Sequence, residues 1–129
     1  MNQYKADQLQ LITNDTGHWL NTTGVDISTV YGFVYIITNK LNGRRYVGCK
    51  QIKTKKNSNW KTYTGSSKAL NSDIAQYGVQ HFSFEILSVY YSRSWLKLAE
   101  ATEIITRKAI TSPDYYNELL YLRIRMKKQ

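Results

Sequence analysis

Two apolar segments separated by a polar turn dominate the first third of the chain. Residues 32–37 read Gly-Phe-Val-Tyr-Ile-Ile, and residues 44–48 read Arg-Arg-Tyr-Val-Gly. The β-branched and aromatic residues of these segments suit a pleated, half-buried strand. Asn42-Gly43 lies between them and is a strong turn dipeptide, because both residues tolerate positive φ. The pattern therefore predicts a β-hairpin.

Each strand of this hairpin carries one tyrosine. Side chains alternate along a strand, so Tyr35 shares a face with Phe33 and Ile37, and Tyr46 shares a face with Gly48. A connection of this length is expected to bring the two phenols side by side. The alternative is that both are ordinary strand tyrosines with hydroxyls at the surface, since the chain contains 11 tyrosines.

A helix and a third strand are expected next. Either serine of the pair at positions 66 and 67 can cap the helix. Leu70, Ile74 and Tyr77 recur at helical spacing, and Gly78 is placed to end the helix. Residues 81–87 then alternate into an apolar run, which predicts a strand.

A longer helix is expected over about residues 94–109, and it has two apolar sides. One side holds Trp95, Leu98, Thr102, Ile105 and Ala109, and the other holds Leu96, Glu100 and Ile104. A helix that is apolar on two sides is expected to pack on two sides. Residues 119–129 follow, and their composition predicts a short basic helix.

This order of elements predicts an α+β fold, an α/β sandwich with a small central three-stranded, mostly antiparallel sheet flanked by helices. A length of 129 residues fits a single domain, 1–129. No apolar run reaches the roughly 20 residues that span a bilayer, and residues 1–7 lack the apolar core of a signal peptide. Cys49 is the only cysteine, so no intramolecular disulfide can form, and we expect Cys49 to be a packing residue. Together these features predict a cytoplasmic location without a membrane partner.

The charge distribution points to a polyanionic partner. The chain has 18 Lys and Arg against 9 Asp and Glu, and no acidic residue occurs between Asp26 and Asp73. That stretch contains Lys40, Arg44, Arg45, Lys50, Lys53, Lys55, Lys56, Lys61 and Lys68. Basic residues interleaved with aromatic ones are typical of a surface that contacts a phosphate backbone. A basic face that only aids solubility is the alternative.

Glu100 is the acidic residue that most needs an explanation. Its neighbours one turn away are Leu96 and Ile104, so a carboxylate interrupts an apolar stripe. A buried carboxylate needs a partner, and a divalent cation is one. The alternative is that Glu100 lies at the edge of the stripe and reaches water or a lysine. Glu103 precedes Arg107 by four residues, which favours a surface ion pair, although Glu103 stays open as the metal ligand.

Together these segments resemble the GIY-YIG nuclease superfamily, in particular a phage-type branch. The matching elements are Gly32-Phe33-Val34-Tyr35, Tyr46-Val47-Gly48, Leu96-x-x-x-Glu100-x-x-x-Ile104, Tyr116-Asn117 and the segment from Tyr63 to Lys68 followed by the strand ending at 84–87. The resemblance covers about residues 32–117. It would leave 1–31 as an N-terminal extension and 118–129 as a basic C-terminal tail.

The resemblance implies an endonuclease that hydrolyses DNA phosphodiester bonds with a divalent metal, Mg²⁺ or Mn²⁺, bound by Glu100. Tyr35 would be the general base and Tyr46 would orient the water or the base, while Asn117 would support the site by hydrogen bonding. The family usually has an arginine on the helix after the second tyrosine motif, but none occurs between Arg45 and Arg93. Lys68 and Lys50 are the candidates to supply that charge, without the bidentate fork of a guanidinium.

Duplex DNA is the implied partner, and RNA stays open. The expected nucleic-acid contacts are Arg44, Arg45, Lys53, Lys55, Lys56 and Lys61. We expect low specificity, recognition by the lysine-rich loop 51–62, or dependence on a homodimer or a protein partner; a phage-encoded protein would act in the host-cell cytoplasm. The alternatives are a nucleic-acid-binding protein of this fold with weak or no catalytic activity, and a basic structural protein of a nucleoprotein assembly.

Overall fold

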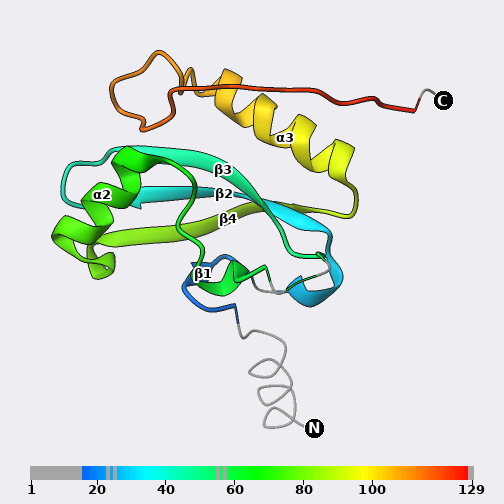
Figure 1. The fold of residues 1–129 in the computed structure, drawn as a ribbon, viewed down its shortest axis with the longest axis horizontal. Coiled ribbons are helices and arrows are strands. Elements are labelled where there is room, and N and C mark those ends of the chain that lie inside the picture. Colours follow the sequence, from blue (N-terminus) through cyan, green and yellow to red (C-terminus); the bar gives the residue numbers. More distant parts are fainter. Residues whose placement is uncertain (1–15, 23, 25, 55, 57, 128–129) are drawn as a thin grey trace, which may run out of the picture.

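The computed structural model describes residues 16–22, 24, 26–54, 56 and 58–127 (Figure 1). Its centre is a four-stranded sheet in the order β1-β4-β2-β3. The strands are β1 (Trp19–Leu20), β2 (Gly32–Asn39), β3 (Arg45–Gln51) and β4 (Phe82–Tyr90). The β2–β3 and β2–β4 pairs are antiparallel, whereas β1 pairs with β4 in parallel. The predicted α+β class and the three predicted strands are confirmed, and β1 adds a short fourth strand.

The β2–β3 hairpin forms as its sequence predicts. Gly43 adopts a φ of 79° in the turn, where a side chain would be strained. The amide of Arg44 donates to the Asn42 side chain at 2.9 Å, which closes the turn. In the resulting register Tyr35 pairs with Gly48 and Ile37 pairs with Tyr46. β3 is thereby the edge strand of the sheet.

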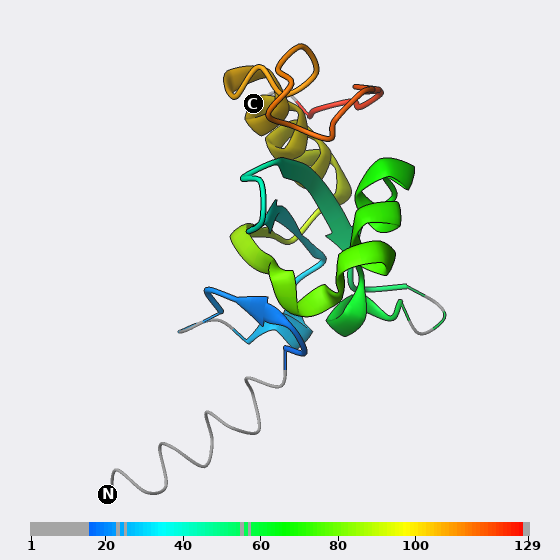
Figure 2. The ribbon, with the colours of Figure 1, turned by 90° about the vertical axis from the view of Figure 1, so that its left-hand side faces the viewer.

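Apolar side chains cover both faces of the sheet, which explains the continuous apolar run of β2. One face carries Phe33, Tyr35 and Ile37, packed with Leu70 of α2 (Lys68–Tyr77). The other carries Val34, Ile36, Val47 and Cys49, packed with Leu96 and Ile104 of α3 (Arg93–Thr106). Figure 2 shows α2 and α3 on their separate sides of the strands. The two helices therefore reach the edge strand β3 from opposite faces.

Short helices complete the connections between these elements. They are 3₁₀ turns at η1 (Ile27–Thr29), η2 (Trp60–Thr62) and η3 (Val79–His81). Of the helices described here, none is long and apolar enough to cross a membrane.

The helix α2 begins and ends where the sequence predicts, but Tyr77, one of the three residues at helical spacing, is not buried. The Ser67 side chain accepts a hydrogen bond from the amide of Leu70, and Gly78 caps the other end with a φ of 99°. Leu70 is fully buried, whereas Tyr77 is 45% exposed. Ile74, one turn after Leu70, is partly buried against the core, so only the last turn of this 10-residue helix, which carries Tyr77, turns its side chain to solvent.

Two-sided packing of the longer helix is wrong for the described part of the chain. α3 ends at Thr106 rather than at 109, and Lys108 just beyond it has a φ of 55°. Trp95 is 57% exposed and Ile105 is 62% exposed, so within the helix that side faces solvent, whereas Ala109, beyond the helix end, is buried. The stripe that contains Glu100 is the one that packs on the sheet. Two apolar stripes at helical spacing do not by themselves tell which one meets the core.

The predicted basic C-terminal helix is also wrong, because residues 118–127 form no regular element. The segment runs extended alongside α3 (Figure 1), and the Ser94 hydroxyl donates to the carbonyl of Arg125 at 3.2 Å. Leu119 and Tyr121 are 77% and 80% exposed, so an apolar helix face has no partner there. A short helix without tertiary packing is marginal in water.

Candidate active site

The two hairpin tyrosines lie side by side on one face of the sheet, as predicted. Their ring centroids are 6.3 Å apart. The Tyr35 ring lies across Gly48, where an added Cβ would come within 2.4 Å of the Tyr35 hydroxyl oxygen. Gly65, with a φ of 83°, approaches both rings from the loop before α2. Two glycines thus make the space that the pair of phenols occupies.

The two phenols differ in their access to solvent. Tyr35 is 1% exposed, and burial, followed by the neighbouring phenols of Tyr46 and Tyr63, raises its pKa well above 10.0. Tyr46 is half-buried, and burial also raises its pKa, while a hydrogen bond from Ser66 opposes that rise. The Tyr46 and Ser66 hydroxyl oxygens are 3.2 Å apart. Tyr46 is therefore the phenol that a substrate could reach.

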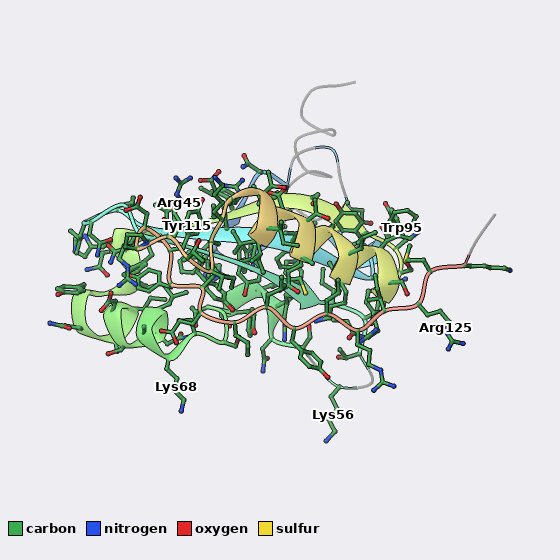
Figure 3. All side chains as sticks on the ribbon, turned by 90° about the horizontal axis from the view of Figure 1, so that it is seen from above. Arg45, Lys56, Lys68, Trp95, Tyr115 and Arg125 are labelled. Atoms are coloured by element: carbon green, nitrogen blue, oxygen red, sulfur yellow. The ribbon has the colours of Figure 1, made fainter. Side chains whose placement is uncertain are left out.

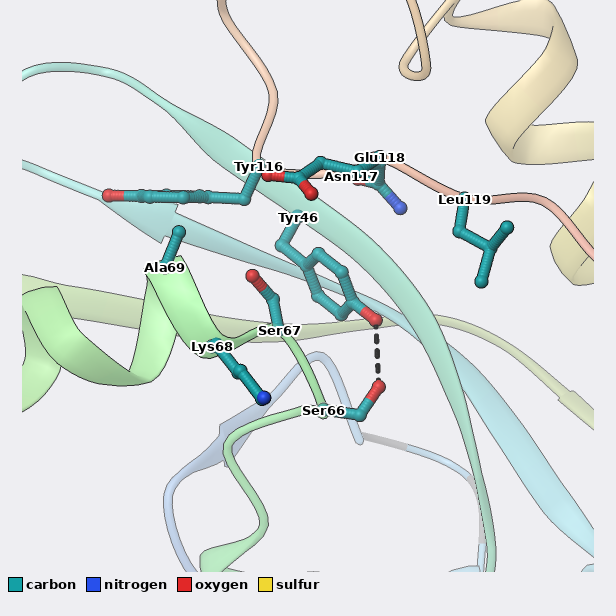
Figure 4. Close-up of a pocket in the computed structure, with 9 residues that line it drawn as sticks. All are labelled: Tyr46, Ser66, Ser67, Lys68, Ala69, Tyr116, Asn117, Glu118 and Leu119. Atoms are coloured by element: carbon teal, nitrogen blue, oxygen red, sulfur yellow. Dashed lines mark hydrogen bonds between the residues drawn. The ribbon is translucent and has the colours of Figure 1, made fainter.

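Tyr46 lines a pocket of about 300 Å³ at the start of β3. Its walls are Ser66, Ser67, Lys68 and Ala69 at the start of α2, and residues 116–119 of the C-terminal segment (Figure 4). The α2 side of the pocket thus combines two serine hydroxyls, an ammonium group and the N-terminus of a helix with the phenol of Tyr46, while the C-terminal side carries the carboxylate of Glu118. The donors on the α2 side suit an anionic ligand such as a phosphate.

The C-terminal segment holds β3 on both sides of Tyr46. The amide of Arg45 donates to the Asp114 carbonyl at 2.9 Å, and the amide of Tyr116 donates to the Arg45 carbonyl at 2.7 Å. The buried side chain of Asn117 accepts from the amide of Val47 at 3.0 Å and donates to the Val47 carbonyl at 2.8 Å. Asn117 therefore acts as a partner strand for the edge strand at the residue that follows Tyr46.

Glu100 approaches the same edge strand from the opposite face. It lies half-buried on α3 near Cys49, whose pKa rises to about 12 through burial and the charge of Glu100. The Glu100 charge also contributes to the raised pKa values of Tyr35, Tyr46 and Tyr63, after burial as the main cause. Glu103 forms an ion pair with Arg107 at 3.0 Å, as predicted.

These residues surround β3 rather than sharing one face. Tyr46 and the pocket lie on the α2 side, while Cys49 and Glu100 lie on the α3 side. Because the C-terminal segment bonds β3 at Arg45 and Val47, the open part of this edge begins after Val47, and a ligand lying there can reach groups from both faces.

The basic side chains of the expected site are dispersed. Lys68 lines the Tyr46 pocket. The Lys50 ammonium lies 4.3 Å from the centroid of the Tyr63 ring. Lys53 and Lys56 are exposed in the loop after β3, and Lys56 projects from the same side of the molecule as Lys68 (Figure 3). The half-buried Lys61 lies near the Trp60 ring, at 5.8 Å. Lys55 lies outside the described residues.

The two arginines before Tyr46 are engaged with the C-terminal segment. The Arg44 guanidinium lies 4.1 Å from the Tyr116 ring centroid, and the Arg45 guanidinium lies 5.4 Å from that of Tyr115 (Figure 3 labels Arg45 and Tyr115). Both side chains keep partial exposure. They stabilise the closure of the segment over β3 and present part of their charge at the surface.

The donor set fits a magnesium-like ion better than a cage-bound metal. Within the described ranges no group of three or more His, Cys, Asp or Glu residues could hold a metal ion. Mg²⁺ usually keeps several waters and is bound by one or two carboxylates together with substrate phosphates. The single carboxylate of Glu100 at an open sheet edge fits that pattern.

The contacts add three residues that sequence reasoning did not assign to the site. Ser66 bonds Tyr46, the Tyr63 ring centroid lies 6.1 Å from that of Tyr35, and Lys97 contacts Cys49 beside Glu100. Ser66 and Tyr63 lie in the segment 63–68 that the resemblance had singled out. Lys97 precedes Glu100 by three residues, so helical spacing could have placed the two on one face.

Comparisons with known proteins show the family of the chain. The family profile described as “Putative endonuclease segE, GIY-YIG domain” matches residues 16–121. “Putative endonuclease segE” of Enterobacteria phage T4 is 39% identical over 88 residues, which are 68% of this chain and 40% of that protein. “Putative endonuclease segB” of the same phage is 32% identical over 88 residues, covering 68% and 38% of the two chains.

“Putative endonuclease segC” of phage T4 is 35% identical over 87 residues, covering 67% of this chain and 41% of that protein. The chain therefore spans about two fifths of the length of these curated relatives. No solved structure matches the chain.

Proposed function

Because this chain belongs to the GIY-YIG domain family of the phage seg-type endonucleases, we propose that it hydrolyses DNA phosphodiester bonds with the help of a divalent metal. The observation that carries the proposal is that the paired rings of Tyr35 and Tyr46, 6.3 Å apart, lie on one side of the edge strand β3 and Glu100 of α3 lies on the other. Residues of these types supply a general base and a metal ligand, which are the groups that metal-assisted hydrolysis requires.

Tyr46 is favoured as the group that takes the proton of the attacking water. Its half-buried hydroxyl lines the pocket, whereas the hydroxyl of Tyr35 is covered by Gly48 and Gly65. Tyr35, which the resemblance implies as the base, would then fix the position of the Tyr46 ring. Because the phenolate form of Tyr46 is disfavoured by burial, a cation at the pocket is needed to favour it.

Lys68 is the better candidate for that cation and for the charge that the family arginine supplies. It lines the Tyr46 pocket at the first residue of α2, where the helix N-terminus adds positive potential. Lys50 lies over the Tyr63 ring, beside the pair of phenols, and is the second candidate. A Lys68→Gln variant that loses more activity than Lys50→Gln would support this order.

Glu100 would hold the divalent ion, which supplies charge stabilisation at the phosphate when bound. Lys68 and the serine hydroxyls would orient the phosphate from the α2 side. Asn117 would keep Tyr46 in place through its two bonds to Val47. The groups that orient the phosphate would thus lie on the α2 side of the sheet, and the metal ligand on the α3 side.

Nicking of a supercoiled plasmid with Mg²⁺ or Mn²⁺ tests the proposal. We expect the wild-type protein to nick and a Glu100→Gln variant to lose nearly all of that activity. Glu103→Gln is the matched control, because it removes a carboxylate of the same helix that forms an ion pair with Arg107. Equal trace activity of wild type and Glu100→Gln would instead favour a nucleic-acid-binding protein without catalysis.

The salt dependence of duplex DNA binding distinguishes a nucleic-acid-binding protein without catalysis from a basic structural protein of a nucleoprotein assembly. If the basic surface neutralises about six phosphates, log Kd is expected to change with log salt with a slope of magnitude near 5. The same titration with duplex RNA shows which nucleic acid is bound with the lower Kd. The mass of the protein–DNA complex, measured by sedimentation, tests for a homodimer.

A further inference from the structure

A second pocket lies at the other end of β3, on the α3 side. Its volume is about 80 Å³, and its lining consists of Tyr31, Cys49, Gln51, Arg93, Leu96 and Lys97. Arg93 and Lys97 are four residues apart on α3, so they project from the same side of the helix. The pocket therefore presents two cationic side chains over a floor made by the end of β3.

Neither cation forms an ion pair in the described part of the chain, although Glu100 lies near Lys97, where both approach Cys49. The ion pair of α3 that forms there joins Glu103 and Arg107, at the far end of the helix. Lys97 contacts the Cys49 thiol, and Arg93 is exposed. Like charges held together at one pocket repel each other, and an anion between them would remove that repulsion.

The pocket is aligned with the proposed active site along the edge strand. Lys97 precedes Glu100 by three residues, which is about 4.5 Å along a helix axis. Gln51 follows Tyr46 by five residues, which is roughly 16 Å along a strand. The two pockets thus lie at opposite ends of β3, a separation that a nucleic-acid strand bridges within several nucleotides. Glu100 lies near Cys49 at the Lys97 end of the second pocket, and Arg93 lies one helical turn further away from it.

We propose that Arg93 and Lys97 form a second phosphate-binding subsite, which holds a backbone phosphate a few nucleotides away from the bond that is cut. This inference rests on the proposed function, because it takes the DNA strand to lie along β3. The two cations neutralise that phosphate and fix the register of the strand at the α3 side. Phosphate contacts of this kind position a nucleic acid without reading its sequence.

The experiment uses the full chain with Glu100→Gln, so that the DNA stays intact, and a fluorescent blunt duplex titrated at several KCl concentrations. Adding Arg93→Gln and Lys97→Gln is expected to raise Kd about tenfold at low salt. It should also make the slope of log Kd against log salt shallower by about 0.9, the value for one phosphate. Lys108→Gln, an exposed charge beyond the far end of α3, should leave the slope unchanged.

A charge-retaining variant separates the subsite from packing. Arg93→Lys with Lys97→Arg keeps both charges and is expected to keep the wild-type slope. An unchanged slope in the double glutamine variant, or an equal loss in the charge-retaining variant, overturns the subsite. Single-turnover cleavage by Lys97→Gln that slows while Kd stays constant also overturns it, because Lys97 would then act at the scissile phosphate.

Two further results keep the outcomes distinct. Thermal stabilisation by inorganic phosphate that the double variant loses, with no change in duplex binding, would assign the pocket to a free anion and overturn the backbone assignment. Wild-type protein that binds the duplex with the expected slope but nicks no plasmid would refute the endonuclease proposal, and Arg93 and Lys97 would then be a backbone contact of a DNA-binding protein.

Discussion

Gly48 shows how one residue without a side chain makes room for the phenol beside it. A Cβ at this position would lie 2.4 Å from the Tyr35 hydroxyl oxygen and 2.6 Å from the ring carbon that carries it. Overpacking of this kind typically costs about 1–3 kcal/mol. We therefore expect Gly48→Ala to lower the free energy of unfolding by that amount in urea denaturation, and to slow plasmid nicking because the Tyr35 ring must move.

Removing the Tyr35 hydroxyl supplies the control for this prediction. In a Tyr35→Phe background the nearest clashing atom is absent, so Gly48→Ala should cost less there than in the wild type. A Gly48→Ala protein as stable as the wild type would show that the ring moves away at no cost.

Ser66 tunes the phenol that faces the pocket. Its hydrogen bond lowers the pKa of Tyr46 against the larger raising effect of burial. Ser66→Ala removes the lowering effect, so the pKa of Tyr46 rises further. If Tyr46 must be deprotonated to act, the alkaline rise of the nicking rate moves to higher pH. Below that rise, the rate at a fixed pH should be about tenfold lower for each pH unit by which the profile moves.

Ser66→Thr keeps the hydroxyl and should retain the wild-type profile. A Ser66→Ala profile that overlays the wild-type profile would mean that Tyr46 does not titrate in the reaction.

At the residue scale the sequence could name candidates but not their contacts. Glu100 stands out because it interrupts an apolar stripe of a helix. Tyr35 and Tyr46 stand out because each lies on one strand of the predicted hairpin. The bond between Tyr46 and Ser66 joins residues 20 positions apart, and that between Asn117 and Val47 joins residues 70 positions apart. Periodicity describes neighbours within one element, so contacts made by folding lie beyond it.

At the element scale, edge strand β3 depends on a single side chain for part of its pairing. Asn117 bonds both backbone groups of Val47 in a buried environment. Asn117→Ala leaves those groups unpaired, and we expect it to lower the free energy of unfolding by about 2–4 kcal/mol. Urea denaturation measures the loss. The exposed neighbour Glu118 provides the control, because Glu118→Ala should change stability by less than about 0.5 kcal/mol.

Helix α2 is tied to the rest of the fold by the hydroxyl of Tyr116. This hydroxyl donates to Asp73 of α2 at 2.7 Å and accepts from Asn39 at the end of β2 at 3.0 Å. Tyr116→Phe removes both bonds and should lower the free energy of unfolding by about 1–3 kcal/mol. Faster amide exchange in α2 would locate the effect.

Tyr77→Phe is the comparison for this variant, since Tyr77 lies on the same helix and is 45% exposed. It should leave both stability and exchange unchanged. If exchange in α2 is equally slow in Tyr116→Phe, the helix is held by Leu70 packing alone.

Elements with strong local signals were predictable, and those chosen by tertiary packing were not. The Asn42-Gly43 turn and the caps at Ser67 and Gly78 act within a few residues, so the sequence is enough. Which stripe of α3 meets the sheet, and whether the C-terminal segment coils, depends on the surfaces available elsewhere in the fold. The same dependence explains why β1, with 2 residues, appears only through its pairing with β4.

At the scale of the whole molecule, the buried phenol of Tyr35 and thiol of Cys49 must stay protonated, so the free energy of unfolding should fall at alkaline pH. Burial raises the pKa of Tyr35 well above 10.0 and that of Cys49 from 9.0 to about 12. A group whose pKa is higher in the folded state adds stability below its unfolded pKa, and that stability is lost as pH rises toward the folded pKa. We therefore expect stability to hold below about pH 9 and to fall between about pH 9 and 12.

Urea denaturation at a series of pH values measures this fall, and two variants assign it. Tyr35→Phe and Cys49→Ala each remove one group that must stay protonated, so each should flatten the alkaline limb even if it lowers stability at neutral pH. Tyr91→Phe is the control, because Tyr91 is 70% exposed and should leave the limb unchanged. If the free energy of unfolding falls equally steeply with pH in all three variants, groups other than Tyr35 and Cys49 cause the loss of stability. The buried phenol of Tyr35 would then ionise at a smaller energetic cost than its burial indicates.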